Sequence, residues 1–188
     1  MLNTLAAIFA KIILSGVALL MLTACSPQYD WRQIQGEGAP FSIAMPAKPT
    51  TFSRQIDLHG TVVRMTMTAA EIGNNTFAIG TAELPDAIQA QRSLQAMQTA
   101  LVNNIAGTIR QQKVSLLPRS TQSQTGAIAI TEIEAVSANQ QAIAGQPRIL
   151  YARFAADDKR IYQLVATGPE QSMTRDLALH FFTSFRLN

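Results

Sequence analysis

The sequence is poor in the residue types that most often carry chemistry. It has 188 residues but a single cysteine, Cys25, and only two histidines, His59 and His180. One cysteine excludes a disulfide scaffold, and neither histidine lies in a metal-ligand spacing such as His-x-x-x-His. Gly-x-Ser-x-Gly elbows, glycine-rich phosphate loops and Ser-x-x-Lys motifs are also missing from the sequence. The sequence therefore gives no positive indication of a metal site, a cofactor or a catalytic centre.

Charge is sparse as well, with charged residues making up 14% of the chain and a formal net charge of +3. The longest basic run is Lys159-Arg160, and it directly follows Asp157-Asp158, so that cluster is neutral. Nucleic-acid-binding surfaces concentrate positive charge on one face or segment. Because the basic residues are scattered along the sequence, we expect no nucleic-acid partner.

The N-terminal segment has the charge order of an export signal. One basic residue, Lys11, precedes the apolar or weakly polar run Ile12–Met21, and the first acidic residue is Asp30. A membrane-spanning helix needs at least about 17 apolar residues, and Ile12–Ala24 supplies only 13. An uncleaved anchor starting at Leu5 would bury Lys11, so a cleaved signal is favoured over that alternative.

The residues Leu22-Thr23-Ala24-Cys25 follow this run, and they resemble the lipobox of bacterial lipoproteins. The resemblance implies cleavage between Ala24 and Cys25, transfer of diacylglycerol to the Cys25 thiol, and acylation of the new amino group, for example with palmitate. Two or three acyl chains hold a protein at a membrane almost permanently. Ser26 follows where inner-membrane lipoproteins tend to have aspartate, so the resemblance favours the periplasmic face of the outer membrane. The alternative for Cys25 is an ordinary buried thiol.

These features predict a signal peptide at 1–24, a short tether at 25–30 and one domain at 31–188. A chain of this length buries enough surface to be stable without disulfides. The tether reaches only about 17 Å when fully extended. We therefore expect the domain, and any partner, to lie close to the bilayer.

Apolar residues alternate with polar ones over most of the domain, which predicts strands. His59-Gly60 and Gly73-Asn74-Asn75 are the expected turns of an N-terminal meander. The predicted strands cover residues 41–45, 52–58, 63–69, 77–81, 127–136, 148–155 and 160–167, with a loop at 119–125.

The period changes between the two groups of strands. Leu94, Met97 and Leu101 form part of an apolar stripe at helical spacing, which predicts a helix from Asp86 to about Gln111. A second helix is predicted from about Pro169 to Phe182, because proline suits a first helical turn. This order predicts an α+β fold in which a long central helix and a C-terminal helix cover an antiparallel sheet, as an α/β/α sandwich.

Two segments at the ends of the domain support that prediction. Phe41–Pro49 and the closing Phe181–Leu187 resemble the ends of PsbP-like α/β/α sandwich domains, named for the photosystem II extrinsic protein. The resemblance covers most of residues 31–188. Members of that family vary widely in role, and many act as assembly factors or binding modules, so the resemblance implies a fold and not a reaction.

Two pairs of polar residues are candidate catalytic or metal-binding groups. Asp57 and His59 share a strand face and suit a metal site or a dyad, although a turn explains them more simply. Glu132 and Glu134 point to one side of a strand and suit paired carboxylates, although a solvated face is the simpler interpretation. His180 beside the apolar stripe of the last helix is more simply a surface or core-edge residue.

Three functional hypotheses follow from these features. The favoured one is a non-enzymatic interaction or assembly module, anchored to the membrane through Cys25 and docking on another envelope protein. The alternative is a carrier or sensor of an apolar ligand or lipid, with Met65, Met67 and the aromatic C-terminus lining its cavity, although ordinary core positions explain these residues more simply. The second alternative is an enzyme with an unrecognised site.

Overall fold

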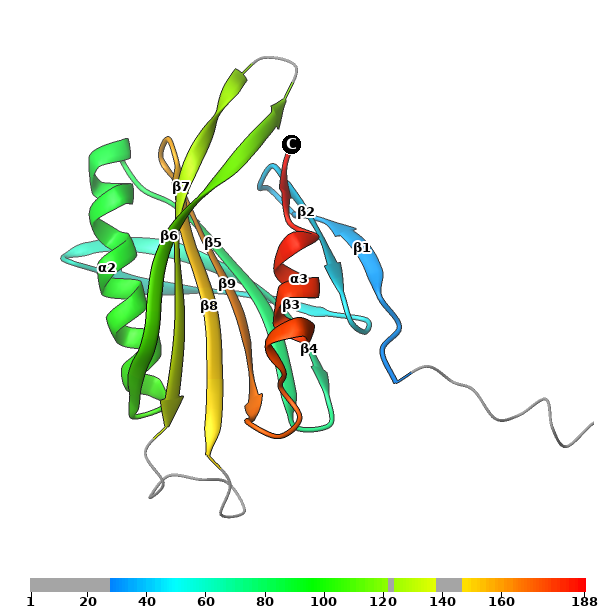
Figure 1. The fold of residues 1–188 in the computed structure, drawn as a ribbon. Coiled ribbons are helices and arrows are strands. Elements are labelled where there is room, and N and C mark those ends of the chain that lie inside the picture. Colours follow the sequence, from blue (N-terminus) through cyan, green and yellow to red (C-terminus); the bar gives the residue numbers. More distant parts are fainter. Residues whose placement is uncertain (1–27, 122–123, 138–146) are drawn as a thin grey trace, which may run out of the picture.

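The structure is a computed structural model that describes residues 28–121, 124–137 and 147–188 (Figure 1). The predicted signal peptide, the cleavage site at Ala24, the lipidation site at Cys25 and the start of the tether lie outside the described residues. Within the described ranges, the helices are too short or too polar to cross a membrane.

A seven-stranded antiparallel sheet forms the centre of the molecule, in the order β3-β4-β5-β9-β8-β7-β6 (Figure 1). Its edges are therefore β3 and β6. The strands are β3 (Thr50–Leu58), β4 (Thr61–Ile72), β5 (Asn75–Glu83), β6 (Gly107–Thr121), β7 (Gln124–Ser137), β8 (Arg148–Asp157) and β9 (Arg160–Pro169).

One face of this sheet is covered by helix α2 (Ala87–Asn104), which packs on β8 and β9. The other face is covered by helix α3 (Arg175–Thr183) and by a small sheet in the order β1-β2-β10 (Figure 1). The strands of the small sheet are β1 (Arg32–Gln35), β2 (Phe41–Met45) and β10 (Arg186–Leu187). The main sheet thus separates two hydrophobic clusters.

The two clusters differ in composition. The cluster under α2 is mainly aliphatic, with residues such as Leu94, Met97 and Leu150. The cluster under α3 and the small sheet is rich in aromatic rings that contact one another, and its fully buried members include Phe77 and Phe181, whose ring centroids lie 5.5 Å apart. Offset and edge-to-face contacts between rings add to the stabilisation that burial provides.

The prediction of an α/β/α sandwich with a long central helix is wrong. The described residues are mostly strands, arranged in two sheets with two helices. The helix predicted to reach Gln111 ends at Asn104, because Ala106 adopts a positive φ of 42° and Gly107 begins β6. The predicted loop at 119–125 is mostly strand, because residues 119–121 belong to β6 and residues 124–125 to β7, while 122–123 lie outside the described residues.

The second helix is also shorter than predicted. Strand β9 continues through Pro169, and α3 begins only after Thr174, whose side chain accepts a hydrogen bond from the Leu177 amide at 3.2 Å. A short helix leaves part of its face of the sheet to the small sheet, in which β1 and β10 were not predicted. The turn predicted at His59-Gly60 is confirmed, with φ values of 54° and 82° that suit a tight hairpin.

Candidate functional site

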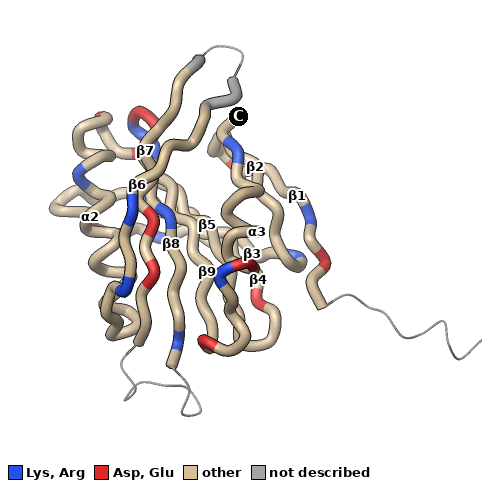
Figure 2. Tube along the Cα trace, viewed as in Figure 1, with Lys and Arg blue, Asp and Glu red and all other residues tan. Residues whose placement is uncertain are grey.

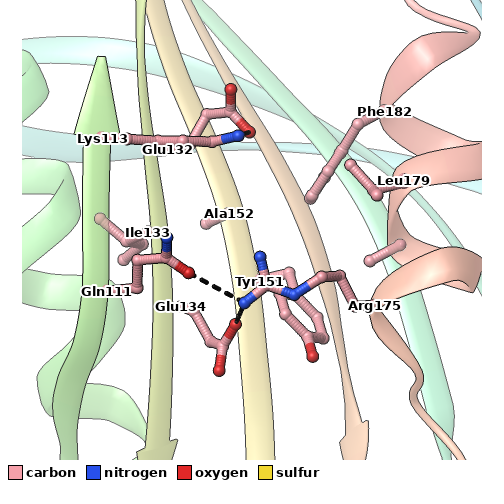
Figure 3. A pocket seen from close by; sticks show the side chains of 11 residues that line it. Gln111, Lys113, Glu132, Ile133, Glu134, Tyr151, Ala152, Arg175, Leu179 and Phe182 are labelled. Atoms are coloured by element: carbon pink, nitrogen blue, oxygen red, sulfur yellow. Dashed lines mark hydrogen bonds and ion pairs between the residues drawn. The ribbon is translucent and has the colours of Figure 1, made fainter. Parts of the chain in front are cut away.

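An open groove lies between α3 and strands β6, β7 and β8, on the face of the main sheet that α3 covers only in part (Figure 3). We call it the α3 groove. The groove is shallow, and the space in it that a water-sized molecule can occupy is about 40 Å³. Its walls are formed by Gln111, Lys113, Glu132, Ile133, Glu134, Tyr151, Ala152, Arg175, Ala178, Leu179 and Phe182.

The register of three strands aligns polar side chains across the floor of the groove. Lys113 of β6 lies opposite Glu132 of β7, which lies opposite Arg153 of β8. Two residues further along β7, Glu134 lies between Gln111 of β6 and Tyr151 of β8. Because side chains alternate between faces along a strand, both rows point to the α3 side. Figure 2 shows two acidic positions on β7, and the register places basic residues on both sides of Glu132 only.

Three side chains from the two neighbouring strands hold the Glu132 carboxylate in place. The Ser115 hydroxyl donates to one carboxylate oxygen at 2.6 Å, while Arg153 and Lys113 approach the other at 3.1 and 3.5 Å. Burial raises the pKa of Glu132, but the Ser115 hydrogen bond and the charges of Arg153 and Lys113 outweigh it. The net effect lowers the pKa of Glu132, so this carboxylate is ionised at neutral pH.

Arg153 is held from above as well as from the side. Its guanidinium lies 4.9 Å from the centroid of the Phe182 ring, which α3 places over the sheet. A cation over an aromatic face gains electrostatic stabilisation that increases as water is excluded. Its buried Nε has no hydrogen-bond partner among the described residues. The ring and the carboxylate therefore fix the guanidinium against the groove floor.

Arg175 at the start of α3 closes the second row. It forms an ion pair with Glu134 and donates to the side-chain oxygen of Gln111 at 2.9 Å (Figure 3). Its guanidinium also lies 5.9 Å from the centroid of the Tyr151 ring. Burial, followed by the negative charge of Glu134, raises the pKa of Tyr151. The helix is thus tied to the sheet through one arginine that bridges two strands.

A further ion pair, between Arg110 and Glu170, connects the β6 edge to the chain segment before α3. Together, these pairs combine four cations with three carboxylates. The cations outnumber the carboxylates by one. The cations are Arg110, Lys113, Arg153 and Arg175, and the carboxylates are those of Glu132, Glu134 and Glu170.

This arrangement suits recognition of charge better than proton transfer. A general acid or base works best with a pKa near the operating pH. The pKa of Glu132 is instead lowered, away from neutral pH, because its partners stabilise the ionised form. In the described ranges, histidine, cysteine, aspartate and glutamate side chains do not gather in groups of three that would hold a metal ion.

The other predicted candidates are not brought to the groove. Asp57 accepts a hydrogen bond from the Gly60 amide at 2.6 Å, so it stabilises the β3–β4 turn in which His59 also lies. His180 is exposed on α3, with its ring centroid 4.5 Å from that of Trp31. The turn and surface interpretations of these residues agree with the structure.

The simpler interpretation agrees with the structure for the two methionines but not for the paired carboxylates. Met65 is buried in the cluster under α2, Met67 packs against that cluster, and both sulfur atoms lie close above Gly80, so they are core residues. The solvated-face interpretation of Glu132 and Glu134 is wrong, because their side chains are only 12% and 14% exposed. The two carboxylates do share one side of β7, as predicted.

The sequence interpretation missed the cations that surround these carboxylates. Arg153 and Arg175 lie about 20 and 40 residues away in the sequence, and only the strand register and the docking of α3 bring them together. The polar residues at 111, 113 and 115 alternate along β6 and were the one local signal available.

The described residues form two antiparallel sheets and a groove lined by charged side chains. No model of a known protein family matches the chain, and no curated protein matches it.

Proposed function

We propose that this protein is a non-enzymatic interaction module that is anchored to a membrane through lipidated Cys25 and binds another envelope protein through the α3 groove. The observation that carries the proposal is the ordered charge array on the groove floor. Its carboxylates are paired across three strands, and its outer cations, Lys113 and Arg175, are about half exposed.

Such an array favours binding because it is already ordered. Arg153 and Arg175 are held by carboxylates and by aromatic rings, so little side-chain freedom remains to be lost when a partner binds. Leu179 and Phe182 add an apolar wall beside the charges. A groove with an apolar wall, oriented polar groups and a positive surplus suits a polypeptide segment that carries a carboxylate.

The start of the described chain supports a site close to the membrane. Trp31 packs against His180 of α3, and Tyr29 accepts a hydrogen bond from Asn75, whose side-chain oxygen accepts one from Ser172 just before α3. The chain that would lead to Cys25 therefore enters beside the same helix that forms one wall of the groove. With a short tether, a lipid anchor at Cys25 would keep the groove near the bilayer.

The two alternatives have less support. The predicted lining of an apolar carrier cavity is packed in two separate places: Met65 and Met67 belong to or pack against the cluster under α2, and the aromatic residues of the C-terminus are buried in the other cluster. General acid-base catalysis by a carboxyl group works best when its pKa is raised toward neutrality. The groove instead lowers the pKa of Glu132.

The test is chemical crosslinking of the full chain in intact cells, followed by mass spectrometry of the purified products. We expect one envelope protein to be crosslinked to the wild-type chain and to be lost with Cys25→Ser, which removes the anchor, and with Arg175→Gln, which opens the second row. Arg92→Gln, on the exposed side of α2, is the matched control and should keep the partner. Equal crosslinking by Arg175→Gln and wild type would refute the groove as the binding site.

A further inference from the structure

The main sheet has two edges, and the edge at β6 lies next to the α3 groove. Strand β6 has 15 residues and pairs with β7, and among the described residues no strand is hydrogen-bonded to its other side. An edge strand presents a row of unpaired backbone amide and carbonyl groups that another extended chain can bind. Several side chains of this strand also line or border the groove.

On the α2 side of the sheet, β6 carries two uncovered apolar side chains. Val114 is 68% exposed and Leu116 is 71% exposed, two residues apart on one face of the strand. On the same face, Gln112 accepts a hydrogen bond from Gln98 of α2 at 3.0 Å. Helix α2 therefore covers this edge up to Gln112 and leaves the next two positions on that face exposed.

On the groove side, β6 carries a half-exposed lysine, Lys113, that is only loosely paired with a carboxylate. Glu132 already accepts a hydrogen bond from Ser115 and pairs with the largely buried Arg153. The Lys113 ammonium is the most distant of its partners, at 3.5 Å, and its side chain is 52% exposed. Lys113 can therefore bind a second carboxylate placed beside the edge while Glu132 remains neutralised.

We propose that β6 binds an extended segment of a partner protein as an eighth strand, and that the segment alternates apolar and acidic residues. Its apolar side chains lie beside Val114 and Leu116, and an acidic side chain lies beside Lys113. Successive side chains of a strand point to opposite faces, so one alternating segment satisfies both faces of β6 at once. The inference rests on the proposed function, since it specifies the chemistry of the segment that binds at the rim of the groove.

The charge of β6 favours such a partner over a second copy of this chain. The strand contains Arg110, Lys113 and Arg119 and no acidic residue. Pairing β6 with β6 of another copy would bring a second half-exposed Lys113 to the edge and no acidic side chain from the added strand, so no new ion pair would form. An acidic segment supplies that side chain and gains an ion pair.

The test uses the purified full chain and a blocked eight-residue peptide of alternating valine and glutamate, with a valine-lysine peptide as the matched control. Hydrogen exchange is measured at saturating peptide concentration. We expect backbone amides within 110–117 to exchange at least tenfold more slowly with the valine-glutamate peptide, with amides of β3 unchanged. The valine-lysine peptide should bind at least tenfold more weakly, and Lys113→Glu should reverse the preference.

Several results would overturn the inference, the first three of which concern protection and peptide selectivity. These three are equal protection of β3 and β6, equal binding of the two peptides, and protection of β6 without peptide that rises with protein concentration, which would identify a second copy as the occupant. Lys113→Gln, which keeps a polar side chain, separates loss of charge from loss of folding and should weaken binding without changing the circular dichroism spectrum. If crosslinking still finds a groove partner while β6 stays unprotected, strand addition is wrong and the proposed function stands.

Discussion

The two faces of the main sheet are covered in different ways, and the difference explains where the groove lies. Helix α2 has 18 residues and follows the sheet over one aliphatic cluster. The other face is covered by the nine residues of α3 together with three short strands. This composite cover leaves β6, β7 and β8 partly open beside α3, and the open part carries the charged rows.

The comparison also shows how charge is tolerated on a sheet face. Unpaired buried charges are costly, whereas paired and hydrogen-bonded ones are tolerated. On the α3 side, Glu132 and Glu134 each have an arginine from a different element. The α2 side has no ion pair of this kind among the described residues, and its buried side chains there are almost all apolar. We therefore expect the two faces to respond differently to substitution.

The largest expected effect is on the aromatic side. Phe181→Ala removes a fully buried ring that contacts Phe77 and Phe182, and should lower the free energy of unfolding by about 4 kcal/mol. Met97→Ala, on the α2 side, is the matched substitution and should cost about 2 to 3 kcal/mol. Urea denaturation followed by circular dichroism measures both. A larger loss for Met97→Ala would contradict the comparison.

The next effect concerns the buried charges. Arg153→Met leaves Glu132 without its closest cation and should lower the free energy of unfolding by about 3 kcal/mol. The double variant with Glu132→Met should recover most of that loss, because no uncompensated charge remains. Arg92→Met on the exposed side of α2 should change stability by less than about 0.5 kcal/mol. If the double variant is as unstable as Arg153→Met alone, packing of Arg153, and not its charge, stabilises the groove floor.

Both covering helices begin at a capping side chain, which allows a direct comparison. Asp86 accepts hydrogen bonds from the backbone amide and the side chain of Gln89, both at 2.8 Å, whereas Thr174 accepts one bond at 3.2 Å. Asp86→Ala should therefore cost about 1 kcal/mol and Thr174→Ala somewhat less. Thermal denaturation of the two variants checks the order, and the reverse order would contradict it.

The smallest expected effect is on the pH dependence of stability. The pKa of Glu132 is lower in the folded protein than its ordinary value of 4.5, so the unfolded chain binds this proton more readily. Its contribution to stability is therefore present above about pH 4.5 and is lost as the pH falls through the lowered pKa of the folded state. The stability difference between wild type and Glu132→Gln, measured by urea denaturation from pH 7 to pH 3, should shrink toward low pH. A constant difference would indicate that the carboxylate charge does not contribute.

The sequence predicts the elements whose residues alternate clearly, and it predicts little about their neighbours. The strand at 41–45 has the predicted bounds, and β8 and β9 extend only two residues beyond them. Strand β6 was missed because it is an edge strand with exposed side chains on both faces, and because the register shift between Ile109 and Gln111 breaks its alternation. Without β6, the helix before it was extended and the fold class was wrong.

The same limit applies to the candidate site. The period of a strand is enough to predict that Glu132 and Glu134 share a side. The period does not indicate that β6 and β8 lie on either side of these glutamates, or that Arg175 of α3 forms an ion pair with Glu134. Those contacts depend on register and on helix docking, which are set by the whole core, so local patterns cannot reveal them.

The central claim is that the side of the molecule with the α3 groove, and not the α2 side, binds the partner. The most direct measurement is site-specific photocrosslinking in intact cells, with a photoreactive amino acid at Gln111 on the groove rim or at Gln95 on the exposed side of α2. The account predicts that Gln111 yields one crosslinked envelope protein and that Gln95 does not. The same protein crosslinked equally well from Gln95, or only lipid crosslinked from Gln111, would contradict it.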